Sequence, residues 1–90
     1  MERVAVKVLF TGRVQGVGFR YRTEDTAQEF TVFGYVKNLP NGQVELIAEG
    51  SSDEVARFVH ALEERMAGHI DEVSKESISS QGFERFFISR

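Results

Sequence analysis

An α+β sandwich, in which two helices cover one face of an antiparallel sheet, is the fold class that the sequence predicts. Two stretches of helical periodicity alternate with stretches of period-two hydrophobicity, in the order β-α-β-β-α-β plus a short terminal strand. The 90 residues, of which 41% are hydrophobic, suffice for one modest core. We therefore expect residues 1–90 to form a single domain.

The first part of the chain predicts a strand, a loop and a helix. Residues 4–10, VAVKVLF, alternate with period two, which predicts a strand with one buried face. Three glycines follow within seven residues and indicate a loop, and residues 20 to about 30 carry a weakly apolar helical stripe. Glu24 and Asp25 are expected in the first turns of this helix, where acidic side chains suit its positive end.

A hairpin is predicted next, because β-branched and aromatic residues at 31–39 and 43–50 flank a turn sequence. The turn, Pro40-Asn41-Gly42, is compatible with two geometries. Either Asn41 and Gly42 form a two-residue type I′ turn, or Pro40 opens a type I turn with Gly42 left-handed. The sequence does not choose between them.

The second helix has the clearest signals in the chain. Ser51 and Glu54 have capping-box spacing, and apolar residues recur at helical spacing from Val55 to Met66. Gly68 suits the left-handed position just beyond the helix end.

Two strands complete the predicted fold: a polar, edge-like strand at residues 70–80 and a last short strand at residues 82–90. The helices occupy the crossover positions of a split βαβ arrangement, and right-handed crossovers give the strand order 4-1-3-2. The prediction is thus a ferredoxin-like α/β sandwich (βαββαβ plus the terminal strand). This fold serves enzymes, RNA-binding modules and regulatory domains alike, so it does not identify a function.

Composition excludes several classes of function. The chain has no cysteine, which excludes disulfides, thiolate nucleophiles and zinc–thiolate sites. A net charge of −3 and an acidic third strand without stacking aromatics argue against nucleic-acid binding. No segment resembles a signal peptide or reaches membrane-span length, so we expect a cytoplasmic protein without membrane partners. His60 and His69 lack suitably spaced carboxylates, so no metal or cofactor is expected, and the polar edge strand favours a monomer.

The segment Gly12–Arg20, GRVQGVGFR, is the most informative one. It joins a strand to a helix start, where unpaired N–H groups and the helix dipole bind anions. Glycines let successive N–H groups turn inward, Val17 and Phe19 are expected to anchor the loop in the core, and the Arg20 guanidinium suits phosphate oxygens. Local spacing leaves open a plain tight turn with a solvated arginine, and leaves Asn38 open as a turn former.

Two motifs together resemble the acylphosphatase family: the run Gly12–Arg20 and residues 34–50, GYVKNLPNGQVELIAEG. The likeness extends over essentially the whole chain, including the terminal F-x-I at Phe86–Ile88. The family is a ferredoxin-like set of small, metal-free hydrolases of carboxyl phosphates. The resemblance implies that Arg20 binds the phosphate and that Asn38 positions the attacking water. It also implies a phosphate-binding loop made of the backbone amides of Gln15, Gly16, Val17, Gly18 and Phe19.

One position departs from the family pattern. Thr31 stands where the family commonly has a glycine at the end of the first helix. A left-handed threonine would be strained by about 1 kcal/mol or more, so the helix end is expected to be rebuilt here.

The resemblance implies metal-independent hydrolysis of small-molecule acyl phosphates to carboxylate and phosphate, with inorganic phosphate as product and inhibitor. Nothing in the sequence builds an obvious acyl-side pocket, so broad acyl specificity is expected. Two alternatives are kept: a non-catalytic module that binds phosphate or acyl phosphate, and an acylphosphatase-like domain of a larger carbamoyl-transfer protein.

Overall fold

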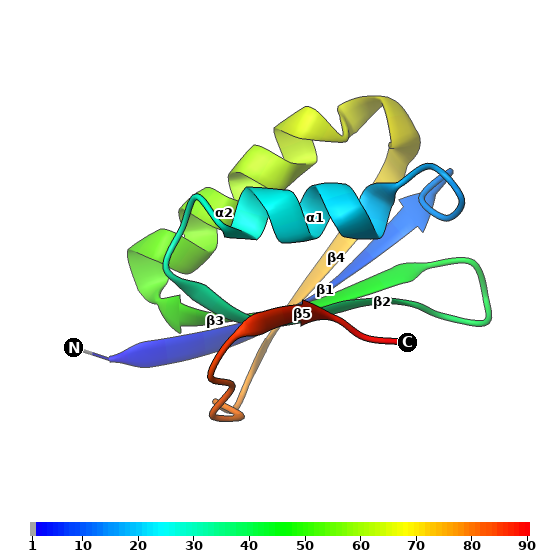
Figure 1. The fold of residues 1–90 in the computed structure, drawn as a ribbon. Helices are drawn as coiled ribbons and strands as arrows, with labels where there is room; N and C mark the ends of the chain where they lie inside the picture. The colour runs from blue at the N-terminus through cyan, green and yellow to red at the C-terminus, as the bar shows by residue number, and fades with distance from the viewer. Residues whose placement is uncertain (1) are drawn as a thin grey trace.

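The computed structural model describes residues 2–90, in which five strands and two α-helices form two layers (Figure 1). The elements are, in chain order, β1 (Arg3–Gly12), α1 (Phe19–Ala27), β2 (Val32–Asn38), β3 (Val44–Ser51), α2 (Ser52–Arg65), the 3-10 turn η1 (Ala67–His69), β4 (Ile70–Ile78) and β5 (Phe86–Ile88). Both helices lie on the same side of the sheet. The predicted ferredoxin-like α+β sandwich is confirmed.

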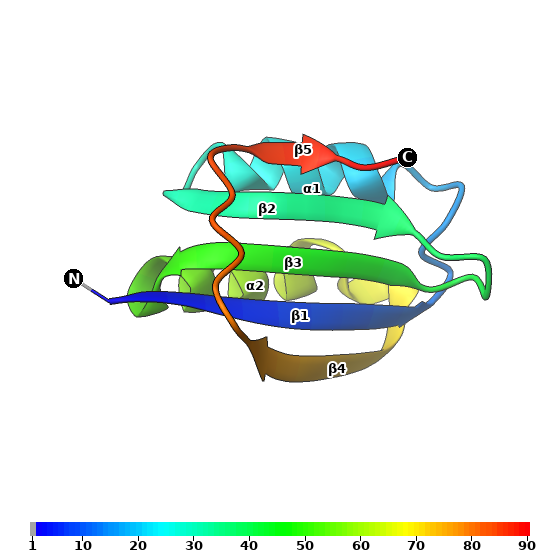
Figure 2. The ribbon, with the colours of Figure 1, turned by 90° about the horizontal axis from the view of Figure 1, so that it is seen from below.

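The strand order is β4-β1-β3-β2-β5, which contains the predicted order 4-1-3-2 (Figure 2). The first four strands pair antiparallel, but β5 pairs parallel with β2, so the prediction of a purely antiparallel sheet was wrong. The reason is the path of the chain after β4. It crosses the open face to the far edge and re-enters the sheet at the end from which β2 also starts.

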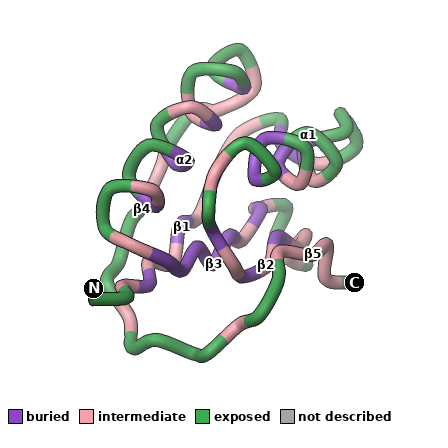
Figure 3. The backbone as a smooth tube through the Cα atoms, turned by 60° about the vertical axis from the view of Figure 1, so that its left-hand side comes forward, coloured by how far each residue is buried: buried purple, intermediate pink, exposed green. Residues whose placement is uncertain are grey.

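The core lies between the helices and the sheet. Strand register puts Val8, Leu46 and Val36 side by side on the helix-facing side, and all three are fully buried. Phe58 and Leu62 of α2 lie on the helix side of this core, and their side chains are fully buried too. In Figure 3 the buried parts of the strands and helices accordingly face one another.

The first helix is shorter than predicted and ends at Ala27. The next three N–H groups, of residues 28–30, bond to carbonyls three positions back, which tightens the chain into a turn. The expected strain at Thr31 is absent, because no non-glycine residue among 2–90 has a positive φ. Instead the Thr31 N–H donates to Glu54 Oε1 at 2.7 Å, which ties the rebuilt helix end to α2.

At the start of α2 the predicted cap is confirmed: Ser51 Oγ accepts the Glu54 N–H at 3.3 Å. The expected role of Gly68 was wrong. Its φ is not positive, because the chain leaves α2 through Met66 into η1 and needs no left-handed residue there.

The hairpin uses the second of the two predicted turn geometries. The Gly42 N–H donates to the Leu39 carbonyl at 3.1 Å, which makes Pro40 and Asn41 the central residues of the turn. Gly42 follows with φ +93°, while Asn41 keeps a negative φ, which excludes the type I′ turn.

The open face of the sheet carries a buried carboxylate under the segment that connects β4 and β5. Glu49 of β3 is fully buried and accepts hydrogen bonds from Ser80 Oγ, from the Gln81 N–H at 3.1 Å and from the Gly82 N–H at 3.0 Å. The Arg3 Nε lies 3.1 Å away. Burial alone would raise the pKa of Glu49, but these hydrogen bonds and the Arg3 charge outweigh it and lower the pKa. Glu49 thus holds the crossing segment to the sheet.

Replacing this carboxylate should destabilise the fold and change its response to acid. We expect Glu49→Ala to lower the free energy of unfolding by about 2–3 kcal/mol at pH 7, because the hydrogen bonds that a charged, buried acceptor makes to the crossing segment are lost. Since the pKa of Glu49 is lower in the folded state than in the unfolded chain, its contribution is complete above the ordinary carboxyl pKa. The contribution is lost as the pH falls through the lowered value.

Urea unfolding at several pH values between neutral and acid measures both effects. Glu64→Ala is the matched control, because the Glu64 side chain is exposed on α2. Equal losses in the two variants at neutral pH would contradict the proposed role of Glu49.

Candidate active site

The alternation of β2 decides which of its last side chains faces the helices. Val36 is buried on the helix-facing side, so Lys37 points to the open face and Asn38 returns to the helix side. There Asn38 meets the start of α1. A hollow of about 170 Å³ is lined by Val14, Gly16, Gly18, Phe19, Arg20, Tyr21 and Asn38. The structure therefore brings together Arg20, Asn38 and part of the predicted loop.

The loop between β1 and α1 is held by two buried side chains. Phe19 is buried with its ring centroid 5.1 Å from that of Phe10, as predicted. Val17 was predicted as the second anchor, but its side chain is 41% exposed. Val14 is buried instead, because the loop turns at residues 15–18 and leaves Val17 on the outside. The exposed stretch between the two anchors is the part that carries the glycines.

The loop glycines are required by backbone conformation and not by space. Gly16 and Gly18 both have φ +77°, and a Cβ at either position would meet nothing within 4 Å. Gly18 is the N-cap of α1 and offers no side-chain cap. The N–H groups of the first helical turn therefore stay available to an anion.

The acidic residues predicted near this helix end lie too far along the chain. Since α1 begins at Phe19, its first turn contains no acidic residue, and Glu24 and Asp25 fall in the second turn. The prediction was wrong by one helical turn. As a result, no carboxylate of the first turn competes with an anion for the positive end of α1.

Two polar groups at the hollow have no partner within residues 2–90. The Arg20 guanidinium makes no ion pair there, although Arg3, Arg57, Arg65, Lys7 and Lys75 all do. Asn38 Oδ1 is buried and accepts no hydrogen bond from the described part of the chain. A buried carbonyl oxygen without a donor costs about 1–3 kcal/mol, so such an atom calls for a ligand or a water.

The side chain of Gln15 has a contact that sequence reasoning missed. Its Nε2 donates to the Leu39 carbonyl at 2.8 Å and to the Gln43 carbonyl at 2.9 Å. This couples the loop to the hairpin directly beyond Asn38. No local sequence pattern predicts these contacts, because the bonded residues are separated by 24 and by 28 positions in the chain. The prediction for Gln15 concerned only its backbone amide.

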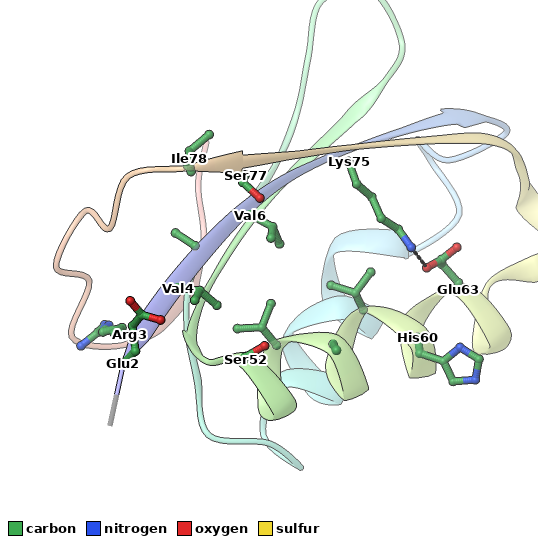
Figure 4. A pocket seen from close by; sticks show the side chains of 14 residues that line it. Glu2, Arg3, Val4, Val6, Ser52, His60, Glu63, Lys75, Ser77 and Ile78 are labelled. Carbon is green, nitrogen blue, oxygen red and sulfur yellow. Dashed lines mark ion pairs between the residues drawn. The ribbon is translucent and has the colours of Figure 1, made fainter.

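A larger hollow of about 570 Å³ lies between α2 and the strands β1 and β4 (Figure 4). Its lining is apolar in the middle, and the lysine and the arginine at its rim already have acidic partners. The pairs are Lys75–Glu63 at 2.8 Å and Arg3–Glu49 at 3.1 Å. An anion gains little from cations that are already neutralised, so the smaller hollow beside Arg20 is the better anion site.

Two further features of residues 2–90 concern metal sites and membrane-spanning helices. No three side chains of His, Asp and Glu come together there as a metal site. No helix in this part of the chain is long and apolar enough to cross a membrane.

Comparison with known proteins matches this geometry to one family. The Acylphosphatase family profile matches residues 6–88, which is most of the chain. The chain belongs to the acylphosphatase family. Family membership makes it an enzyme of the hydrolase class.

Individual relatives support the assignment. An acylphosphatase of Trichormus variabilis is 42% identical over 90 residues, covering 97% of this chain and 87% of that protein. The crystal structure of acylphosphatase from Bacillus subtilis superposes with a TM-score of 0.86 at 32% identity, covering 97% and 99% of the two chains. The structure of HypF from T. kodakarensis also matches, with a TM-score of 0.79 and 37% identity, over 94% of this chain and 11% of that one.

A glycine substitution tests the loop conformation. We expect Gly18→Ala to lower the free energy of unfolding by about 1 kcal/mol, since an alanine at φ +77° is strained although it clashes with nothing. Gly68→Ala is the matched control, because Gly68 also has open space around it but a negative φ. Urea unfolding of both variants measures the difference. Equal stabilities would show that the left-handed conformation is not needed.

Proposed function

We propose that this acylphosphatase hydrolyses the carboxyl–phosphate bond of small acyl phosphates without a metal ion, through Arg20, Asn38 and the loop amides of residues 15–19. One observation carries the proposal. Within residues 2–90, a guanidinium without an ion pair, the free N–H groups of a helix start and a buried amide oxygen without a donor all border a single hollow. The first two suit a phosphoryl group and the third suits a water molecule.

Binding the phosphoryl group is the task of the basic end of the site. An acyl phosphate carries about two negative charges on its phosphoryl oxygens. The Arg20 fork and the N–H groups from Gln15 to Phe19 can meet all three oxygens, and Gly16 and Gly18 supply the left-handed backbone that turns those N–H groups inward. Charge stabilisation and positioning account for most of the catalysis of phosphoryl transfer.

Asn38 supplies the position of the nucleophile. Its Oδ1 accepts a hydrogen bond from a water and aligns that water with the phosphorus, opposite the leaving oxygen. The water oxygen forms the new bond to phosphorus while the bond to the acyl oxygen breaks and a carboxylate leaves. An amide cannot act as a general base, and the hollow has no His, Asp or Glu in its lining. The water's proton therefore passes to a phosphoryl oxygen of the substrate.

We further propose that residues 1–90 work as one domain, as a monomer, in the cytoplasm. One continuous core cluster, which draws on both helices and on β1, β2 and β3, supports the single domain. The edge strand β4 is mostly exposed and polar, which disfavours pairing with a second sheet. The absence of cysteine fits a reducing compartment.

The role of Arg20 is tested by its removal. We expect Arg20→Ala to lower kcat/KM for benzoyl phosphate by about 10³–10⁵, as for loss of an arginine finger. Arg20→Lys should not restore the rate, because a lysine lacks the bidentate fork. Hydrolysis is followed by ultraviolet absorbance with and without EDTA.

Arg22→Ala is the matched control for the arginine variants, since Arg22 is exposed on the same helix but does not line the hollow. A similar rate loss in Arg22→Ala would point to the general charge of α1 instead of a specific contact. Loss of activity with EDTA would contradict the metal-independent reaction.

The role of Asn38 is tested by separating binding from turnover. We expect Asn38→Ala to lower kcat by about 10²–10³, as for loss of one positioning group, with little change in the inhibition constant of inorganic phosphate. If phosphate inhibition weakens as much as turnover, Asn38 binds phosphate and does not position water. Absence of turnover in the folded wild-type protein would favour a non-catalytic binding module.

A further inference from the structure

Two large hydrophobic side chains are exposed in the part of the chain that the structure describes: Tyr21 at 61% and Val17 at 41%. Both lie at the start of α1. Val17 directly precedes the N-cap Gly18, and Tyr21 belongs to the first helical turn. Tyr21 also lines the hollow that holds Arg20 and Asn38. Scattered exposed apolar residues need no explanation. Val17, however, lies in the chain between Gly16 and Gly18, which line the same hollow as Tyr21.

The depth of Asn38 decides which end of a substrate reaches these side chains. In-line displacement places the attacking water and the leaving oxygen on opposite sides of the phosphorus. Asn38 Oδ1 is buried, so a water held by it occupies the inner end of the hollow. The acyl group must then leave from the outer end, where Tyr21 and Val17 are exposed.

The charge of the site favours an uncharged acyl group. Arg20 is the one charged residue among the seven that line the hollow, and the phosphoryl group engages it. A second anionic group on the acyl part would find no cation in this lining. An aromatic or branched acyl group, in contrast, would cover the Tyr21 ring and the Val17 methyl groups and remove their apolar surface from water.

We propose that Tyr21 and Val17 form an apolar acyl-binding surface at the mouth of the site, which makes the enzyme select acyl phosphates with aromatic or bulky apolar acyl groups. The inference rests on the hydrolase function proposed above. It narrows the broad acyl specificity expected from the sequence. Tyr21 is here a specificity-determining residue and takes no part in the chemical step.

The test compares benzoyl phosphate with acetyl phosphate, which carry the same reacting group and differ in the acyl part. We expect the wild-type protein to prefer benzoyl phosphate in kcat/KM. In Tyr21→Ala the ratio of the two kcat/KM values should fall about three- to tenfold, through KM for benzoyl phosphate, since the ring contact is lost. Tyr21→Phe should keep the ratio, because the ring remains. His60→Ala should also keep it, because this exposed residue of α2 lies at the other hollow.

The outcomes separate this inference from the proposed function. Turnover of both substrates with an unchanged ratio in Tyr21→Ala overturns the acyl-binding surface and leaves the hydrolase function intact. A preference of the wild type for 4-carboxybenzoyl phosphate over benzoyl phosphate also overturns the apolar acyl-binding surface. Such a preference would mean that nearby arginines recognise a charged acyl group. Absence of turnover of every acyl phosphate by folded wild-type protein overturns both proposals together. Tyr21 is exposed, so its variants are expected to fold and each result can be interpreted.

Discussion

The anchoring of one short loop by the buried side chains of Val14 and Phe19 is the constraint on which the candidate site depends. Between these anchors the backbone must turn from a strand into a helix, and two left-handed glycines make that path possible. The anchors belong to the core itself, where Phe19 packs on Phe10 of β1. The geometry of the candidate site is therefore set by the same packing that stabilises the fold.

The charge pattern of the molecule complements this geometry. The protein is acidic overall, with a net charge of −3, yet the lining of the hollow contains no acid and one arginine. Several basic side chains elsewhere are engaged in ion pairs, such as Lys7 with Glu45 at 3.6 Å on the open face. Arg65 of α2 similarly donates from Nη2 to Glu29 Oε1 at 2.9 Å, and that hydrogen bond lowers the pKa of Glu29. Within residues 2–90, the one cation that lines the hollow, Arg20, thus has no acidic partner there to compete with an anion.

Much of this was predictable from the sequence because the signals are local. Period-two hydrophobicity located the strands, while the Ser51 cap and the apolar stripe located α2. The family motifs pointed to Arg20, Asn38 and the loop amides, and the structure groups Arg20 and Asn38 at one hollow.

What the sequence could not reveal depends on contacts between distant segments. The Thr31 N–H donates to Glu54, 23 positions away. This contact holds the end of the first helix at the position where the family pattern has a glycine. Burial of Val14 in place of Val17 depends on how the loop turns, which no periodicity describes. The parallel pairing of β5 follows from the route of the preceding segment across the sheet, which is fixed by Glu49.

That route also has a consequence for how the protein behaves when it partly unfolds. The short strand β5 covers the outer edge of β2, and the only chain that leads to it within residues 2–90 crosses the open face over Glu49. If the crossing segment were released together with β5, the backbone of β2 would become a free sheet edge. The sheet would then have two free edges, β2 on one side and β4 on the other. Unlike the polar edge of β4, the edge of β2 carries β-branched and aromatic residues, so it could pair with a neighbouring molecule. By holding the crossing segment in place, the Glu49 carboxylate keeps the β2 edge covered and so disfavours self-association. Acid conditions that protonate Glu49 would favour aggregation before the helix-covered core is lost.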